Sequence, residues 1–228
     1  YLASRLAGID RDTKVADLAA GNGALLVEAD PGNVKAVEVD KTRAASLNRQ
    51  GFPVALADGA AAEIDEAVDV LILTPPFYSR GGKDAKIYRP QPGSDYATRD
   101  LDKAIALNGL RQMKENGRAV LILPSAHPKL IEAELKAKAP EDTARANEAR
   151  RKAYQTRGVR RFHHELYGRY RVTDHFTVRG KMFGQQGALW PIDVVVIDGK
   201  GPSERARPGV EPPRIYTSFE QLAGDFHE

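Results

Sequence analysis

The sequence predicts an α/β protein built on a mostly parallel, doubly wound sheet. Short apolar runs typical of buried strands alternate with helical patterns along the first half of the chain. Several of these runs end in Gly, Asp or Pro, which are common turn residues after a strand. The length of 228 residues and the hydrophobic content of 42% fit one globular domain of this kind.

The first third of the chain has a repeated strand–helix pattern. We expect a helix at residues 2–8, followed by strands at residues 14–18, 34–40, 54–57 and 68–73. Helical patterns at residues 24–29 and 41–50 fill two of the connections. Strand–helix–strand units of this type form parallel sheets with right-handed crossovers.

A long polar segment follows the fourth strand. Residues 78–99 are rich in Gly, Pro, Lys and Arg, and we expect them to form a functional loop. A helix is expected at residues 101–115, because Asn116-Gly117 is typical of a left-handed helix end. A fifth strand follows at residues 118–123.

The last part of the chain adds a helical region and a pair of strands. Residues 129 to about 155 have a helical pattern that Pro140 interrupts. Apolar runs at residues 170–178 and 191–197 are expected to pair antiparallel around an excursion at residues 180–187. We place one domain at residues 1–199, with a basic insertion at about residues 138–171, and a Pro/Gly-rich, linker-like tail at residues 200–228.

Composition limits the classes of function. The chain has no cysteine, which excludes disulfides, thiolate zinc sites and cysteine nucleophiles. No apolar run approaches the roughly 20 residues that span a bilayer, and no secretory signal opens the chain, so we expect a cytoplasmic protein without a membrane partner. Because the first residue is Tyr1 rather than Met, we expect the chain to be a piece of a longer polypeptide with other domains.

A glycine turn and an acidic residue mark the end of the first predicted strand. Asp17 is followed by Ala19, Gly21 and Gly23, and glycines here let the backbone approach a ligand closely. A nicotinamide-binding turn would have a third glycine where Leu26 stands. The pattern therefore favours a different adenosine-containing ligand.

Two more acidic residues end the second and third predicted strands. The Glu38 carboxylate is placed to accept hydrogen bonds from both hydroxyls of a ribose. Asp58, next to Gly59, is placed to accept a hydrogen bond from the amino group of adenine. Each acid taken alone could equally be a solvated strand end or a helix cap, but their succession at three strand ends favours a binding site.

Thr74, Pro75, Pro76 and Phe77 follow the fourth predicted strand directly. Two prolines end a strand, so this tetrapeptide lies at a carboxyl edge, where open α/β sheets bind ligands. Taken alone, it could be a stiff turn. Its place after the glycine turn and the three acids gives it more weight.

In order and spacing, residues 15–26, 37–40, 57–58 and 74–77 resemble the motifs of class I S-adenosylmethionine-dependent methyltransferases. The resemblance is greatest to the amino-group (N6-adenine) DNA methyltransferases, whose fourth motif is usually Asn-Pro-Pro-Phe/Tyr or Asp-Pro-Pro-Tyr. It covers residues 2–125 well and the last two strands loosely. It implies a Rossmann-like seven-stranded methyltransferase fold with an antiparallel last strand, and no metal ion. It also implies that S-adenosyl-L-methionine is bound by Asp17, Ala19, Gly21, Gly23, Glu38, Asp58 and Gly59.

The resemblance also implies the reaction, which is methyl transfer to an exocyclic amine of a nucleic-acid base, first of all adenine N6 in DNA. The Thr74 side chain and the Pro75 carbonyl would accept the amine hydrogens, and Phe77 would stack on a base rotated out of the helix. Thr74 departs from the motif, since its oxygen lies about one atom short of a carboxamide oxygen, and such misplacement slows catalysis. A weak or silent binding module, and methylation of RNA or of a protein glutamine, are therefore alternatives.

Residues 145–171 contain nine Lys/Arg but only two Asp/Glu, with four aromatic residues interleaved. Such a composition is typical of surfaces that neutralise phosphates and stack on unpaired bases, although an ordinary solvated helix is the alternative. We expect DNA, or alternatively RNA, to contact Arg150, Arg151, Arg157, Arg160 and Arg161 here, and Arg80 and Lys83 in the polar loop. The adjacent His163 and His164 are expected at the surface or on phosphates rather than on a metal ion.

Overall fold

The structure is a computed structural model, and it describes residues 2–77, 86–125, 128–180 and 190–226. Its elements in chain order are α1 (Leu2–Ala7), β1 (Val15–Asp17), η1 (Pro31–Asn33), β2 (Val34–Glu38), α2 (Lys41–Arg49), β3 (Val54–Leu56), β4 (Val68–Leu73), α3 (Leu101–Arg111), β5 (Met113–Pro124), α4 (Pro128–Lys136), α5 (Pro140–Tyr154), α6 (Arg157–Arg169), β6 (Tyr170–Val178), β7 (Ile192–Lys200), β8 (Arg214–Tyr216) and α7 (Phe219–Phe226).

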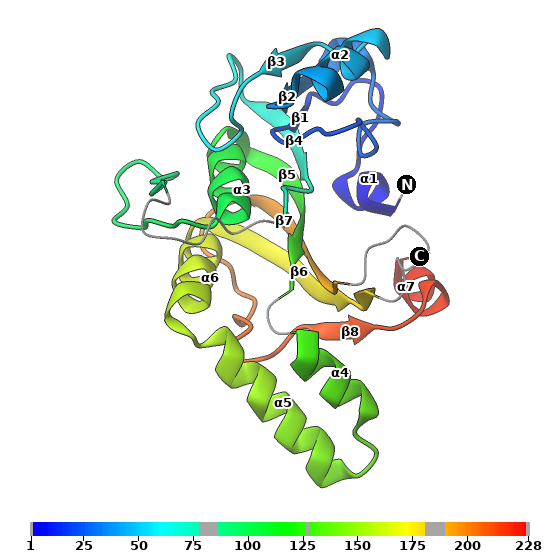
Figure 1. Ribbon diagram of the computed structural model, residues 1–228, viewed down its shortest axis with the longest axis vertical. Coiled ribbons are helices and arrows are strands. Elements are labelled where there is room, and N and C mark those ends of the chain that lie inside the picture. The colour runs from blue at the N-terminus through cyan, green and yellow to red at the C-terminus, as the bar shows by residue number, and fades with distance from the viewer. Residues whose placement is uncertain (1, 78–85, 126–127, 181–189, 227–228) are drawn as a thin grey trace.

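The strands form one eight-stranded sheet in the order β3-β2-β1-β4-β5-β7-β6-β8 (Figure 1). Strands β1 to β5 are parallel, β7 runs antiparallel to both β5 and β6, and β8 is parallel to β6. The predicted fold class is therefore confirmed, with an eighth strand at one edge. The carboxyl ends of β1 to β5 and the amino end of β7 meet at one edge of the sheet, on both sides of the β1/β4 switch point.

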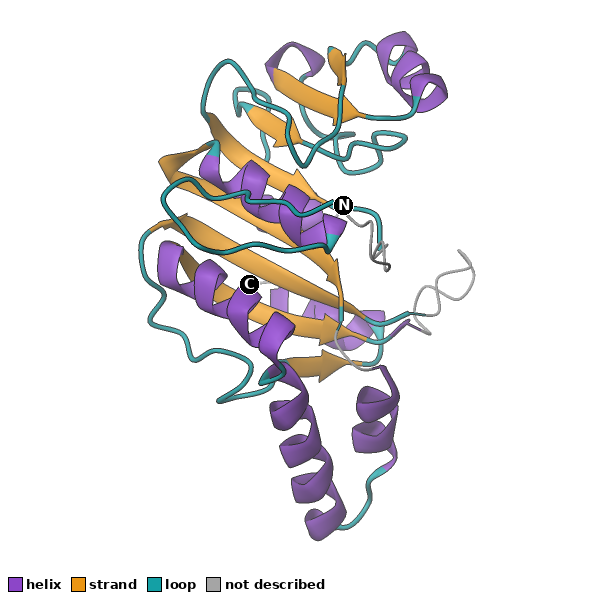
Figure 2. Cartoon of the chain, turned by 60° about the vertical axis from the view of Figure 1, so that its left-hand side comes forward, coloured by secondary structure: helices purple, strands orange, loops and turns teal. Residues whose placement is uncertain are grey.

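Helices cover both faces of the sheet. Buried side chains of α3 and α6 pack on one face, and those of α1, α2 and α7 pack on the other. Figure 1 shows α3 and α6 to the left of the sheet and α1 and α7 to the right. Helices α4 and α5 form a hairpin that extends beyond the sheet (Figure 2). None of the helices that the structure describes has the length and apolar character required to cross a bilayer.

The helix predicted at residues 24–29 does not form. Successive single turns take its place, in which Gly23 N, Leu26 N and Ala29 N each donate to the carbonyl three residues earlier. The segment is too short to overcome the cost of starting a helix, and Pro31 holds Asp30 in an extended conformation. Consequently no helix N-terminus faces a ligand directly after the glycine turn.

Helix α3 ends at Arg111, earlier than predicted, and β5 begins at Met113. Strand pairing with β4 skips from Met113 to Arg118, so the intervening residues bulge out of β5. Gly117 lies in this bulge, where a Cβ would overlap Met113 and lie 2.9 Å from the Asp69 carbonyl oxygen. Close packing against β4, rather than the end of a helix, explains this glycine.

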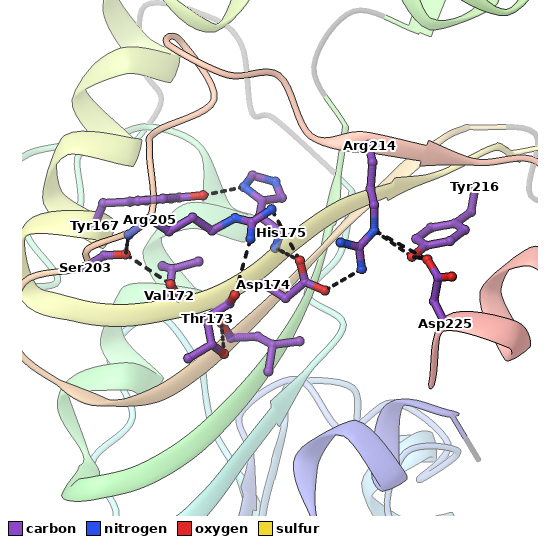
Figure 3. Close-up of polar contacts among 11 residues, drawn as sticks. Tyr167, Val172, Thr173, Asp174, His175, Ser203, Arg205, Arg214, Tyr216 and Asp225 are labelled. Carbon is purple, nitrogen blue, oxygen red and sulfur yellow. Dashed lines mark hydrogen bonds and ion pairs between the residues drawn. The ribbon is translucent and has the colours of Figure 1, made fainter. Parts of the chain in front are cut away.

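The prediction of a linker-like tail is wrong for residues 214–226. Strand β8 pairs with β6, and α7 packs Leu222 into the core. An ion pair ties β8 to β6, because Arg214 Nη2 lies 2.8 Å from Asp174 Oδ2 (Figure 3). Arg205, in the loop before β8, reaches the other oxygen of Asp174 at 3.4 Å. Tail residues therefore complete the sheet.

Candidate active site

The glycine turn after β1 is held in a left-handed conformation. Gly21 and Gly23 have φ angles of +56° and +79°, which side chains other than glycine rarely adopt. A Cβ at Gly21 would have only the Ala19 carbonyl oxygen within 4 Å, at 3.9 Å, so space is open above this residue. A Cβ at Gly23 would lie 2.8 Å from Leu47. Gly21 thus leaves room for a ligand, whereas Gly23 permits packing on α2.

Asp17 lies under this turn as a buried carboxyl group. Its Oδ1 accepts a hydrogen bond from Ala19 N at 2.9 Å. Burial raises the pKa of Asp17 to about 7, the Ala19 hydrogen bond opposes this rise, and the nearby Glu38 charge adds to it. The side chain therefore shapes the turn, and its charge depends on pH near neutrality.

Glu38 joins the glycine turn to the end of β2. The side chain is 5% exposed; its Oε2 accepts from Gly21 N and its Oε1 from Asp40 N, both at 2.8 Å. A carboxylate has about four acceptor positions, so two remain for a ligand. These contacts place a fixed, partly unsatisfied carboxylate beside the open space at Gly21.

Asp58 and Gly59 follow β3 and reach the end of β1. A Cβ at Gly59 would overlap the Leu18 carbonyl oxygen, so only glycine allows this approach. Asn108 of α3 fixes the Gly59 carbonyl with a 2.9 Å hydrogen bond. The Asp58 carboxylate is partly exposed and lies 3.5 Å from Lys86 Nζ. The acids Asp17, Glu38 and Asp58 thus gather at one edge of the sheet.

The tetrapeptide after β4 lies at the same edge. Thr74, Pro76 and Phe77 are exposed and Pro75 is buried. Phe77 is 44% exposed, which is high for a large apolar side chain. Among the described residues, the Thr74 hydroxyl has no hydrogen-bond partner. The tetrapeptide therefore presents a hydroxyl and an aromatic ring outward, next to β1 and β5.

A cavity of about 700 Å³ adjoins Phe77. Its aromatic walls include Tyr154 of α5, Phe162 of α6 and Trp190, which precedes β7. This volume is within the range of roughly 300–1,000 Å³ that is usual for small-molecule sites. Sequence reasoning did not find this cavity, because its walls come from elements far apart in the chain.

Asp193, the second residue of β7, lies in the cavity wall and is 5% exposed. Its Oδ1 accepts from the Thr177 hydroxyl at 2.7 Å, and its Oδ2 accepts from the Tyr154 hydroxyl at 3.0 Å. Burial alone would raise the pKa of Asp193, but the nearby His175 and the hydroxyl donors outweigh it and leave the pKa below its ordinary value. Asp193 is therefore charged at neutral pH. The one signal for it in the sequence is an acid that interrupts the apolar run at residues 191–197.

Two stacked histidines border the same cavity. The rings of His163 and His175 are 5.7 Å apart and inclined by 28°. His163 Nδ1 lies 3.0 Å from the Val159 carbonyl, which can only accept, so Nδ1 carries the proton of the neutral ring. His175 Nδ1 is 2.8 Å from the Tyr167 hydroxyl (Figure 3). Burial, together with the nearby His175, lowers the pKa of His163 to about 3.

The predicted surface position is therefore wrong for His163. Helix α6 turns Phe162, His163, Leu166 and Tyr167 toward the sheet and leaves His164 exposed. The described residues contain no cluster of three or more His, Asp or Glu that could hold a metal ion.

The predicted nucleic-acid residues divide into four groups. Arg150 is buried and is bound to Glu134 and to the Pro213 carbonyl, so its prediction as a phosphate contact is wrong. Arg151 is partly exposed and pairs with Glu148. Arg80 and Lys83 lie outside the described residues.

The remaining predicted residues form a basic face on α6. Arg157, Arg160 and Arg161 share one side of the helix with His164, since residues three, four and seven apart lie on one face. Arg161 also donates to the Asp95 carbonyl at 3.2 Å and lies over the Tyr96 ring. A hollow of about 510 Å³ between this face and Arg207 adjoins Tyr154 and His163. The basic face and the cavity are therefore neighbours.

No protein-family model and no curated protein matches the chain. Among solved structures, a modification subunit assigned to a type I restriction enzyme of Vibrio vulnificus matches with a TM-score of 0.54 and 15% identity, over 89% of this chain and 44% of that one. A protein of a type I restriction–modification system matches with a TM-score of 0.53 and 13% identity, over 84% and 39% of the two chains.

A third solved structure, a mycolic acid cyclopropane synthase in complex with SAH and CTAB, matches with a TM-score of 0.50 and 14% identity, over 86% of this chain and 81% of that one. The chain spans less than half the length of the two restriction–modification proteins. At these identities the likeness establishes the fold alone, which this chain shares with the two restriction–modification proteins and the cyclopropane synthase.

Proposed function

We propose that the chain transfers a methyl group from S-adenosyl-L-methionine to an exocyclic amine of a nucleic-acid base, first of all adenine N6 in DNA. One observation carries this proposal. Three carboxylates, those of Asp17, Glu38 and Asp58, lie at the ends of neighbouring strands, at the same sheet edge as Thr74 and Phe77. Open α/β sheets bind nucleotide-like ligands at this edge.

The residues at the strand ends fit S-adenosyl-L-methionine. Glu38 retains two acceptor positions for ribose hydroxyls, and Asp58 is exposed enough to accept from the adenine amine. The open space at Gly21 allows close approach of the ligand to the backbone. When bound, this cofactor supplies an electrophilic methyl group on a sulfonium.

The tetrapeptide after β4 prepares the acceptor amine. An exocyclic amine is a weak nucleophile, because its lone pair is delocalised into the ring. The Pro75 carbonyl and the Thr74 hydroxyl accept hydrogen bonds from the amine, which favours the charge that develops on nitrogen. Phe77, exposed beside the cavity, stacks on the base.

Nucleic acid is the proposed partner because of the basic face on α6. Arg157 and Arg160 are exposed and form no ion pair with any described residue, so both are available to phosphates. Likeness to two type I restriction–modification proteins favours DNA over RNA. Other domains of a longer polypeptide would then select the sequence.

Product analysis tests this function. The protein is incubated with labelled S-adenosyl-L-methionine and unmethylated DNA, RNA or protein, and the products are digested. We expect label in N6-methyladenine from DNA. Label only in RNA or only in protein would overturn the proposed substrate. A Phe77→Ala variant, expected to lose most of the label, controls for methyltransferases carried over from the expression host.

A second candidate, a methyltransferase-fold binding module, is favoured by two observations. Thr74 stands in place of the motif's Asn or Asp, and no helix follows the glycine turn. Calorimetric titration with S-adenosyl-L-methionine separates the candidates. Cofactor binding without transfer to any acceptor would support the module, whereas no binding at millimolar cofactor would contradict every enzymatic function.

A further inference from the structure

The cavity beside Phe77 contains buried polar atoms without partners. Ser125 Oγ, at the end of β5, and His175 Nε2, on β6, are buried and make no hydrogen bond of ordinary length within the described chain, although both lie beside the Asp193 carboxylate, with His175 Nε2 3.6 Å from Oδ2. Both residues line the cavity and are 3% and 1% exposed. Buried polar atoms are normally hydrogen-bonded, so these atoms indicate a place where polar groups of a ligand are received.

Asp193 adds a buried negative charge to the same wall. Two hydroxyls donate to it and His175 Nε2 lies 3.6 Å away, yet no Lys or Arg of the described chain forms an ion pair with it. The His175 ring is its nearest potential cation and lies too far away for a hydrogen bond, so the carboxylate can still receive an N–H donor from a ligand. Each oxygen accepts one hydrogen bond and keeps capacity for another.

The surrounding walls are suited to a flat ring. Phe77, Phe162 and Trp190 line the cavity with Leu123 and Val195, so aromatic and aliphatic surfaces face the polar atoms. Flat heteroaromatic rings stack on such side chains. An amino-substituted base would place its ring between these walls and its amine on the carboxylate.

We propose that Asp193 is a catalytic residue, which accepts a hydrogen bond from the acceptor amine and so supplies the anionic acceptor that Thr74 does not provide. This inference rests on the proposed function. In the transfer, the nitrogen lone pair forms the new N–C bond while the S–C bond breaks and leaves its electron pair on sulfur. The nitrogen becomes positively charged and then loses one proton to water. A carboxylate at the amine stabilises that charge.

A purely structural Asp193, which would only join β6, β7 and α5 through Thr177 and Tyr154, makes different predictions. A structural role does not require unpaired polar atoms in the cavity wall. The effect of replacing Asp193 would then not depend on the identity of residue 74. The tests below therefore combine position 74 with position 193 and compare ligands that differ only in the amine.

The first test is a double-mutant cycle on methyl transfer to DNA. Asp193→Asn keeps the size but removes the charge and one acceptor oxygen, so only one of the Thr177 and Tyr154 hydroxyls can still donate to it. We expect it to lower kcat about a hundredfold, as loss of a preorganised electrostatic group does. Thr74→Asn should restore at least about tenfold in the Asp193→Asn background, because it returns an acceptor to the amine. Asp198→Asn, on the exposed end of β7, is the matched control and should stay at the wild-type rate. A loss that Thr74→Asn does not restore, with a lowered Tm, would overturn the proposal.

The second test measures binding and needs no turnover. Trp190 is the single tryptophan of the chain and lines the cavity, so its fluorescence reports a stacked ring. We expect adenosine to quench it with a Kd about tenfold lower than that of purine riboside, which lacks the amine, and Asp193→Asn to abolish the difference. Free tryptophan titrated with the same nucleosides controls for inner-filter effects.

The two tests distinguish a failure of the proposed methyltransferase function from a failure of the proposed role of Asp193. Amine-selective quenching that depends on Asp193, without any methyl transfer, would remove the proposed function and keep the cavity as an amine-binding site. Equal quenching by both nucleosides, or none, would overturn the role of Asp193 even if the protein methylates DNA.

Discussion

Arg150 of α5 and Glu134 of α4 form a two-point ion pair, with Arg150 Nη1 2.8 Å from both carboxylate oxygens. Arg150 Nη2 donates to the Pro213 carbonyl at 2.6 Å, just before β8. The side chain is 2% exposed. This one guanidinium thus joins the helical hairpin to the strand that the tail adds to the sheet.

Arg150→Met should therefore destabilise the fold. It leaves the Glu134 carboxylate and the Pro213 carbonyl without their donor, and removing one partner of a buried pair costs about 3–5 kcal/mol. Urea unfolding followed by circular dichroism measures this. Arg157→Gln, an exposed change on α6, is the control and should leave the unfolding free energy within about 0.5 kcal/mol. An Arg150→Met protein as stable as wild type would contradict the structural role.

The exposed face of α6 leads to a second prediction. Arg157→Gln/Arg160→Gln should weaken DNA binding and lower the slope of log K against log[salt] by about 0.9 per lost phosphate contact. Fluorescence anisotropy at several salt concentrations measures both quantities. Lys35→Gln/Lys114→Gln removes the same charge from ion-paired lysines at strand ends away from α6 and should leave the slope unchanged. Equal slopes for all three proteins would place the nucleic-acid surface elsewhere.

The fold was predictable because its signals are local. The strands at the ligand edge are mainly apolar runs, several of which are followed by Gly, Asp or Pro, and such signals come from residues that are neighbours in the sequence. Two local predictions failed, the first because the segment is too short to start a helix and the second because of a tertiary contact. The turns at residues 24–29 replaced a helix, and Met113 joined β5 because it pairs with Val68 on β4.

The candidate site was only half predictable. Asp17, Glu38 and Asp58 each end a strand, so their common edge follows from the topology of a parallel sheet. The cavity joins Ser125, Tyr154, His175 and Asp193 from four separate elements, and no spacing in the sequence relates them. Arg150 was misassigned for a similar reason, since charge clustering does not reveal which arginine of a basic helix turns inward.

Gly21 and Gly93 give a matched test of the cofactor site. Both have positive φ, +56° and +72°, so Ala should cost each site about 1 kcal/mol of backbone strain. A Cβ at Gly93 meets nothing within 4 Å, whereas a Cβ at Gly21 enters the open space beside Glu38. We expect Gly21→Ala to weaken S-adenosyl-L-methionine binding at least about tenfold by calorimetry, and Gly93→Ala to leave it unchanged. If the two variants bound S-adenosyl-L-methionine with similar affinity, the glycine turn would not be part of the binding site.

Asp17 should make the fold less stable as the pH rises from 5 to 8. Its folded pKa of about 7 lies above the ordinary 3.8, so the folded protein keeps a proton that the unfolded chain has lost. Between these values the Asp17 contribution to stability falls as pH rises, by about 2–3 kcal/mol from pH 5 to pH 8 from this group alone. Asp17→Asn keeps the acceptor for Ala19 N and removes the titration, so its unfolding free energy should lack this contribution and rise relative to wild type as pH increases. Urea unfolding at both pH values measures it, and an unchanged pH dependence in the variant would assign the effect to another group.

His163 should produce the opposite dependence over the same pH range, so the two groups largely offset each other in the wild-type protein. Its folded pKa of about 3 lies below the ordinary 6.5, so between these pH values the unfolded chain binds a proton that the buried ring does not bind. Stability is complete above pH 6.5 and falls as pH decreases, by about 2 kcal/mol between pH 7.5 and pH 5 from this group alone.

His163→Phe keeps an aromatic ring against Phe162 and His175 and removes the titrating group. The change in unfolding free energy from pH 7.5 to pH 5, measured by urea unfolding, should therefore be about 2 kcal/mol more favourable than in the wild type, because the Asp17 contribution is then unopposed. His164→Phe, at the exposed neighbouring position, is the control and should show the wild-type pH profile. If the stabilities of His163→Phe and wild type changed equally between these pH values, the ring would have to accept protons in the folded state, and its burial against the cavity would be wrong.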